Sequence, residues 1–104
     1  MDRSDRITLL TRSYTTDAVG NQVPVETGDE VFCQVQSVGS GEFFAAGQTG
    51  LKPEYKVTLL RYEYNGQTLA AYRGRRYRVY RSYTGRGETA ELYLERTAGD
   101  EGEA

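Results

Sequence analysis

The chain has 104 residues, a net charge of −2, no histidine and one cysteine, and it is rich in tyrosine and glycine. This composition is typical of a β-rich protein, and the length predicts one domain at residues 1–97 followed by a disordered acidic tail at residues 98–104. The missing histidine excludes the usual structural zinc sites, and a single cysteine excludes an internal disulfide. No stretch is long and apolar enough for a membrane span or a signal peptide, so we expect a soluble cytoplasmic product without cofactor, metal or membrane contact.

The first third of the chain predicts a hairpin-like opening followed by a strong strand. Residues 6–15 are β-prone and end at the turn-forming sequence TDAVGNQ, after which residues 23–26 form a short extended piece. Residues 30–38 alternate cleanly and place Cys33 on the same face as Val35, where a small buried side chain is expected. A lone cysteine without histidine is also a poor candidate for a catalytic nucleophile.

The second half predicts a meander of four short antiparallel strands. Asn65-Gly66 and Arg73-Gly74 match the two-residue hairpin turn, because both central positions of that turn need positive φ, and TGRG supplies the last turn. The strands joined by these turns are residues 54–64, 69–72, 76–83 and 88–96. About six strands in all favour an all-β fold with minor helix, a small antiparallel β-barrel, since closure removes the unpaired edges of an open sheet.

A long insert, residues 38–53, separates the second predicted strand from the third. Connections of this length are uncommon in small domains unless they are functional or disordered. The sequence GEFFAAGQ predicts one or two helical turns with flanking glycines as hinges, and Pro53 marks the return to extended structure. Phe43 and Phe44 either fold over the open end of the barrel and complete its core, or contact a partner. The candidate channel, gating or partner residues are Gly39, Gly41, Glu42, Phe43, Phe44, Gly47, Gln48, Gly50, Leu51 and Lys52.

Charge is segregated along the chain. Residues 60–86 carry a net charge of +6 and lie between segments of net −3 and −5. Alternation along the strand RRYRVYRSY predicts that Arg81 shares a face with Tyr77 and Val79. The arginines could attract DNA phosphates, meet acidic residues of a neighbouring copy, or pair with glutamates on the adjacent strand of their own barrel. The candidate inter-subunit or DNA-facing residues are Arg73, Arg75, Arg76, Arg78 and Arg81.

Three pieces of the chain carry a family resemblance: VFCQVQSV, EFFAAGQTGLKPEYKV, and YRGRRYRVYR with ELYLER at the end. In this order and spacing, over residues 4–96, they resemble the head-closure or head-tail joining proteins of long-tailed bacteriophages. The resemblance implies a small β-barrel that is made in the host bacterial cytoplasm and assembles as a ring at the head-tail interface of the virion. Its implied partners are the portal-adaptor complex, the tail terminator or tail tube protein, other copies of itself, and packaged DNA that it retains without reading sequence. The insert at residues 38–53 is then the loop that projects toward the channel and contributes to the gate.

Two other classes of function fit less well. A nucleic-acid-binding barrel of the OB type would use Tyr72, Tyr77, Tyr80 and Tyr83 as stacking platforms, but the acidic pI argues against a dedicated binder. An enzyme is not expected, because the chain lacks histidine, a glycine-rich phosphate loop, and a nucleophile with an adjacent base. Because one small core uses most of the apolar surface, we expect the free chain to be a monomer or a weak oligomer.

Overall fold

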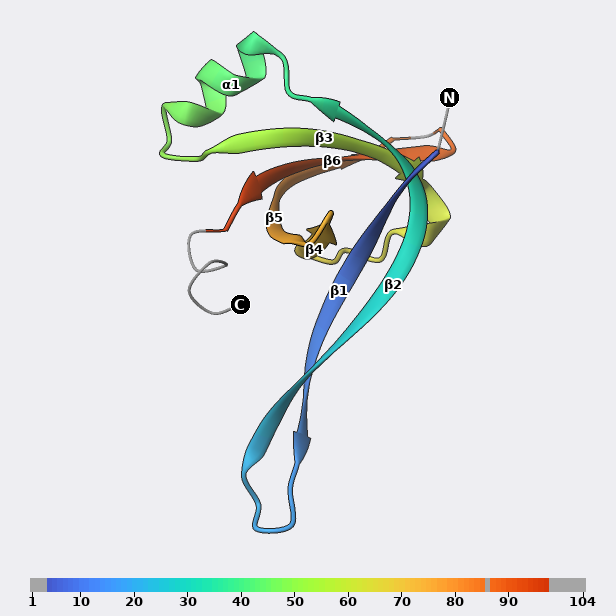
Figure 1. Cartoon of the computed structure of the whole chain (residues 1–104), viewed down its shortest axis with the longest axis vertical. Coiled ribbons are helices and arrows are strands. Elements are labelled where there is room, and N and C mark those ends of the chain that lie inside the picture. Colours follow the sequence, from blue (N-terminus) through green and yellow to red (C-terminus); the bar gives the residue numbers. More distant parts are fainter. Residues whose placement is uncertain (1–3, 86, 98–104) are drawn as a thin grey trace.

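The computed structural model describes residues 4–85 and 87–97, and the tail predicted at residues 98–104 lies outside them. Six strands form one closed barrel in the order β1-β2-β3-β6-β5-β4, and neighbouring strands are antiparallel (Figure 1). The elements are β1 (Asp5–Thr16), β2 (Gln22–Ser37), α1 (Ser40–Gly47), β3 (Pro53–Leu60), the 3-10 helix η1 (Arg61–Glu63), β4 (Leu69–Tyr72), β5 (Arg75–Thr84) and β6 (Thr89–Arg96). The predicted all-β barrel with a short helix between its second and third strands is confirmed.

The interior of the barrel is filled by the inward-facing residues of all six strands. On β6 the alternation places Ala90, Leu92 and Leu94 inside, where each is fully buried. Cys33 is fully buried as well, as its strand pattern predicts. The other core residues are Ile7, Leu9, Val31, Val57, Leu59, Ala70, Tyr72, Tyr77 and Val79. The barrel is therefore a packed scaffold whose burial of apolar surface stabilises the fold.

Three tyrosine rings pack together within this core. Tyr55 lies edge-on to Tyr72 and to Tyr77, with ring centroids 5.4 and 5.6 Å apart. The Tyr72 hydroxyl donates to Asp5 Oδ2 (3.0 Å), and the Tyr77 hydroxyl donates to Glu54 Oε2 (3.4 Å). Burial, followed by the nearby carboxylates, raises the pKa of Tyr72 and raises the pKa of Tyr77 to about 12. Two of the tyrosines considered as stacking platforms are thus part of the core.

A two-stranded arm leaves the barrel. β1 pairs with β2 along its whole length, from Asp5 to Thr16, whereas it pairs with β4 only over residues 8–10. β3 pairs with β2 only from Cys33 onward. Residues 11–27, called the arm below, therefore extend past the barrel as an exposed ribbon (Figure 1). The arm raises the radius of gyration to 15.0 Å, against about 13 Å expected for a compact domain of this length.

The long second strand differs from the two separate pieces that the sequence predicts. Residues 22–37 run as one strand through Gly28. A Cβ at Gly28 would lie only 2.6 Å from Thr8 Cγ2, so this glycine permits a close approach between β1 and β2. In the sequence the same glycine resembles a turn signal, which is why the extent of the arm is not predicted.

The predicted meander is wrong at its first turn. β3 pairs with β2 and β6, not with β4, and only β4, β5 and β6 follow one another as neighbours. After η1 the chain crosses the barrel end through a loop in which the Asn65 N–H donates to Gln67 Oε1 (2.8 Å). The Arg73-Gly74 turn forms as predicted, with φ values of 52° and 79°. Asn65 does not adopt positive φ, so Asn65-Gly66 is not the tight hairpin turn that its residue types suggest.

A β-bulge between Val79 and Arg81 changes the expected faces of β5. Tyr77 and Val79 share a face as predicted, and both point into the core, but Arg81 is exposed. The extra residue in the strand directs Tyr80 and Arg81 together to the outer surface, where both contact α1. The predicted shared face of Tyr77, Val79 and Arg81 is therefore wrong at its third member.

Candidate functional site

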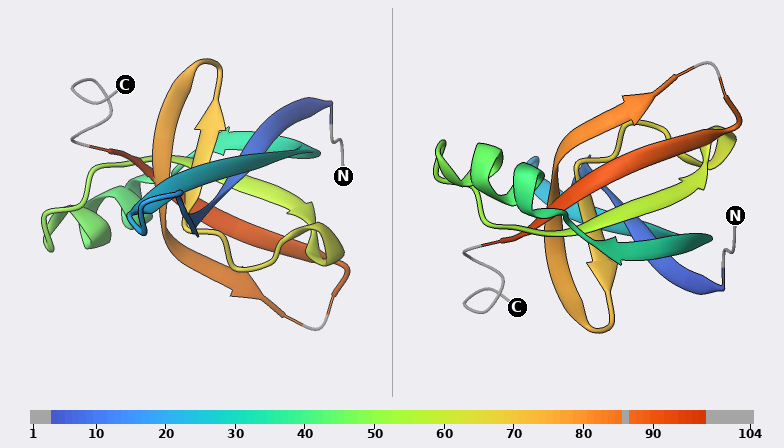
Figure 2. Two further views of the ribbon diagram at one scale, coloured as in Figure 1. Left: turned by 90° about the horizontal axis from the view of Figure 1, so that it is seen from below. Right: turned by 90° about the horizontal axis from the view of Figure 1, so that it is seen from above.

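The insert folds into α1 and a returning loop on the outside of β3. α1 lies beside β3 and outside the barrel (Figure 2), at the opposite end of the molecule from the tip of the arm (Figure 1). The helix begins after Gly39, and no side chain caps its N-terminus. It ends where Thr49 Oγ1 donates to the carbonyl of Ala46 (2.7 Å) and Gly50 turns the chain with a φ of 88°. The predicted helical turns thus span Ser40–Gly47.

Few contacts hold α1 against the barrel. Ala46 is the buried residue of the helix. The Tyr80 hydroxyl donates to Glu42 Oε2 (2.6 Å), and Arg81 binds the other carboxylate oxygen of Glu42 while stacking over the ring of Tyr93 (4.2 Å to the centroid). Burial, and then the Glu42 carboxylate, raises the pKa of Tyr80 well above its usual value, so its hydroxyl remains a donor at neutral pH. We call Glu42, Tyr80, Arg81 and Tyr93 the helix clamp.

Phe43 and Phe44 point away from the barrel. Their side chains are 51% and 69% exposed, and the two rings pack edge to face on each other with centroids 6.1 Å apart. Neither ring belongs to the buried core, so the possibility that one of them completes the barrel end is wrong. Aromatic side chains often contribute most of the binding energy at protein interfaces, and α1 exposes two adjacent ones.

A groove of about 260 Å³ adjoins the first of these rings. Arg96 and Glu54 pair across it (3.3 Å), whereas the Lys52 side chain contacts no carboxylate among residues 4–85 and 87–97. The lining residues are Phe43, Leu51, Lys52, Pro53, Glu54 and Arg96. Apolar rings beside a groove with an available cation suit an apolar partner segment that carries a negative charge.

The insert glycines predicted as hinges differ in whether their backbone conformation requires glycine. Only Gly50 has positive φ, and a Cβ at Gly39, Gly41 or Gly47 would meet no atom within 4 Å. We expect Gly41→Ala to raise the thermal unfolding midpoint, because alanine is favoured inside a helix by about 1 kcal/mol. Gly50→Ala should lower it, because a side chain at this φ costs about 1 kcal/mol or more. Thermal unfolding of both variants is the measurement, and shifts of the same sign would contradict this account.

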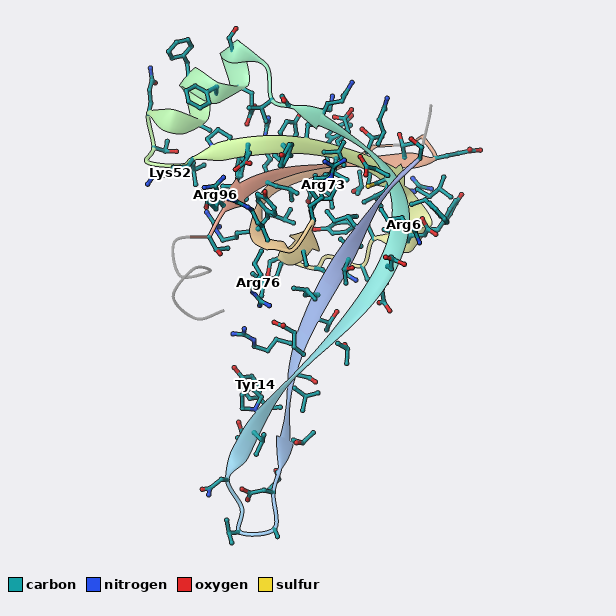
Figure 3. The ribbon with its side chains drawn as sticks, in the orientation of Figure 1. Arg6, Tyr14, Lys52, Arg73, Arg76 and Arg96 are labelled. Atoms are coloured by element: carbon teal, nitrogen blue, oxygen red, sulfur yellow. The ribbon has the colours of Figure 1, made fainter. Side chains whose placement is uncertain are left out.

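Three of the five predicted arginines pair with acidic side chains of their own chain. Arg76 donates to both carboxylate oxygens of Glu26 in the arm, at 2.9 and 2.7 Å, and this contact is the main cause that lowers the pKa of Glu26. Arg78 Nε donates to Glu95 on β6 (2.7 Å), and Arg81 is part of the helix clamp. Arg76 thus connects the barrel to the arm, as its position between them in Figure 3 shows.

The remaining two are Arg73, which lies in the β4–β5 turn, and Arg75, the first residue of β5. Neither binds a carboxylate in the part of the chain that the structure describes, and Arg73 lies over the ring of Tyr72 (5.3 Å to the centroid). Glu91, a glutamate on the strand adjacent to β5, pairs with Lys56 (3.3 Å) and not with one of the five arginines. The basic surface that is free to meet a partner is therefore this turn rather than the whole of β5.

The tyrosines do not form a stacking surface for nucleic acid bases. Tyr72 and Tyr77 are buried and Tyr80 is held by the helix clamp, which leaves Tyr83 as the exposed member of the four (64%).

Across residues 4–85 and 87–97, no helix is long and apolar enough to cross a membrane. No three histidine, cysteine, aspartate or glutamate side chains in the same ranges gather as metal ligands.

The sequence predicts the hairpin of β1 and β2 but not its extension past the barrel as the arm. Its signal is present in two patterns: the alternation of residues 23–31 continues through Gly28, and residues 13–51 contain five acidic residues but no lysine or arginine. The structure adds that Tyr14 and Val19 of the arm are 59% and 79% exposed. The insert and the arm are therefore two separate exposed elements on one barrel.

The relatives of the chain agree with this architecture. Residues 2–99 match the family model described as phage head completion protein. The fold is similar to the solution structure of protein SF1141 from Shigella flexneri 2a, with a TM-score of 0.71 and 19% identity over 90% of this chain and 92% of that chain, a similarity that shows the fold alone. No curated protein matches the chain. The chain therefore belongs to the phage head completion proteins, structural components that close the phage head and contact other head and tail components of the virion.

Proposed function

We propose that the chain assembles as a ring at the head-tail junction, docks on the portal-adaptor complex, retains the packaged DNA and gives the tail terminator or tail tube protein its attachment surface. A rigid barrel with two exposed elements at opposite ends suits this position between two larger assemblies. The free chain is then a monomer or weak oligomer, since its buried core is complete without a partner.

The observation that carries the proposal is the exposed Phe43 and Phe44 pair on a helix with few anchors. Adjacent exposed aromatic rings form a contiguous apolar patch, and such patches are typical of surfaces that contact a partner. The anchors of α1 are one buried alanine and the polar helix clamp, which a partner can exchange for other polar contacts at modest cost. The insert at residues 38–53 is thus the element that we assign to the gate or to the contact with the adaptor.

The arginine contacts favour a role in protein assembly over a role in gripping DNA. Arg76, Arg78 and Arg81 are already neutralised by glutamates of the same chain, so they offer little net charge to phosphates. Arg73 and Arg75 remain for a neighbouring subunit or for the DNA backbone in the channel. Two arginines at one turn can fix the register of a protein contact, but they offer few charges for binding the DNA backbone.

The experiment that tests the proposal is imaging of the neck of virions from the phage or prophage that encodes the chain, by electron cryomicroscopy. The proposal predicts one ring of copies between the portal-adaptor complex and the tail, with Phe43 and Phe44 covered. Virions whose neck lacks the protein would overturn it.

A further inference from the structure

We propose that the arm of one copy inserts its tip into a groove at the base of the arm of the next copy, so that successive copies are joined head to tail. This inference rests on the proposed ring and names the contact that would build it. A two-stranded ribbon alone in water is only marginally stable, so an arm of this length is expected to be covered by another surface.

The tip of the arm is a preformed turn with an apolar residue at its apex. Asp17 Oδ1 accepts hydrogen bonds from the N–H groups of Val19 (3.0 Å) and Asn21 (2.8 Å), and the Asp17 N–H donates to the Asn21 carbonyl (2.9 Å). Val19 is 79% exposed, the highest value among the large apolar residues. Because the turn is already ordered, docking it costs little conformational entropy, which favours it as an insertion element.

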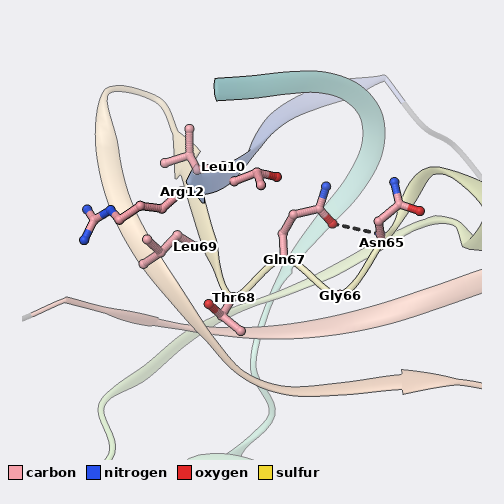
Figure 4. Close-up of a pocket in the computed structure, with 8 residues that line it drawn as sticks. Leu10, Arg12, Asn65, Gly66, Gln67, Thr68 and Leu69 are labelled. Atoms are coloured by element: carbon pink, nitrogen blue, oxygen red, sulfur yellow. Dashed lines mark hydrogen bonds between the residues drawn. The ribbon is translucent and has the colours of Figure 1, made fainter. Parts of the chain in front are cut away.

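A groove of about 270 Å³ lies where the arm leaves the barrel, between β1 and the loop that precedes β4 (Figure 4). Leu10 and Leu69 give one side of the groove an apolar surface. Arg12 lies beside them, and its guanidinium also binds Glu26 of the same arm (3.4 Å). The opposite side is ordered by the hydrogen bond from the Asn65 N–H to Gln67 Oε1 (2.8 Å), with the Gln67 side chain buried. The lining residues are Leu10, Thr11, Arg12, Asn65, Gly66, Gln67, Thr68 and Leu69.

The tip and the groove are complementary in size, polarity and charge. The groove volume is close to the lower end of ligand pockets, about 300 Å³, which suits the few side chains of a turn. Val19 matches the apolar side of the groove at Leu10 and Leu69. Asp17 carries the charge opposite to Arg12, whose half-exposed guanidinium binds Glu26 (3.4 Å) and would accept Asp17 as a second carboxylate. A contact of this chemistry already exists within one chain, where the arm residue Glu26 binds an arginine of the barrel.

A chain cannot fill its own groove. Leu10 and Asp17 are seven residues apart, about 23 Å along a paired strand, and the strands of the arm are paired up to its last residues. The tip that fills the groove must therefore come from another copy. Because the tip and the groove are different surfaces, such contacts repeat from copy to copy and close into a ring when their rotation fits.

The test is a disulfide between the tip and the groove of the isolated protein. In Val19→Cys/Thr68→Cys, mild oxidation should link copies into a ladder of covalent oligomers that ends at one closed species and disappears on reduction. Both positions are exposed, and Cys33 does not interfere, because burial raises the pKa of its thiol to about 11. The matched control is Val19→Cys/Glu88→Cys, whose second thiol is exposed on the β5–β6 turn. Equal ladders from the two variants, or none from either, would overturn the proposal.

Val19→Asp separates this contact from the proposed function. An exposed valine contributes little to the folded barrel, so the thermal unfolding midpoint should stay unchanged while ring copies in the virion neck are lost. Head-tail joining with no Val19–Thr68 ladder would overturn the arm contact and leave the proposed function standing. If the Val19–Thr68 ladder forms but the protein is absent from the virion neck, the arm contact stands and the proposed function is overturned. Loss of joining in Val19→Asp without any ladder would assign the tip to a different protein or to DNA, and would also overturn the proposal.

Discussion

Replacing Phe43 and Phe44 together by serine should abolish the joining of heads to tails while leaving the thermal unfolding midpoint of the free protein unchanged. Both rings are more than half exposed and lie outside the core, so their removal costs the barrel little. An aromatic anchor at an interface contributes about 2 kcal/mol or more, so the loss of two weakens a contact by about a thousandfold. The measurement is joining in a lysate that lacks the native protein, to which purified wild type or variant is added.

The matched control for this double variant is Phe32→Ser/Tyr83→Ser. These aromatic side chains are exposed to a similar extent, 56% and 64%, but lie on β2 and β5, outside the insert. The control should join heads to tails as the wild type does. Normal joining by Phe43→Ser/Phe44→Ser, or equal loss in both double variants, would contradict the assignment of the contact to α1.

The free energy of unfolding should fall steeply as the pH rises from about 10 to about 12. In the folded protein the pKa of Tyr77 is raised from 10.0 to about 12, chiefly by burial and then by Glu54. The unfolded chain therefore loses this proton first, so the stabilisation is complete below pH 10 and is lost as the pH passes through the folded value. A change of two pKa units corresponds to about 3 kcal/mol. The raised pKa values of Tyr72 and Tyr80 act in the same direction.

Denaturant unfolding of the wild type and Tyr77→Phe across this pH range measures the effect. The variant cannot ionise at this position, so its stability should decline less between pH 10 and 12. Tyr14→Phe, at an exposed site in the arm, should retain the wild-type dependence because the arm lies outside the core. A Tyr77→Phe profile parallel to that of the wild type would contradict the assigned role of burial.

Local patterns predicted most of the barrel. Alternation identified the buried face of the strand around Cys33, and the Arg73-Gly74 turn followed from its need for positive φ. The resemblance to phage head-closure proteins is confirmed by the family match over residues 2–99. These features depend on neighbours in sequence or on a family pattern, both of which a sequence displays directly.

The remaining features depend on contacts between distant residues. Asn65-Gly66 has the residue types of a hairpin turn, but β3 pairs with β6 and not with β4. The loop between β3 and β4 is ordered by the Gln67 side chain instead. The bulge before Arg81 turns that arginine toward Glu42, 39 positions away in sequence. The outward direction of Phe43 and Phe44 likewise follows from Glu42 and Ala46 being the residues of α1 that face the barrel.

Electron cryomicroscopy of the virion neck should show a closed ring of this barrel between the portal-adaptor complex and the tail. In this ring Phe43 and Phe44 are buried against a partner, and each arm is seated on the next copy. A neck without this protein, or a ring in which both phenylalanines remain open to solvent, would contradict this arrangement.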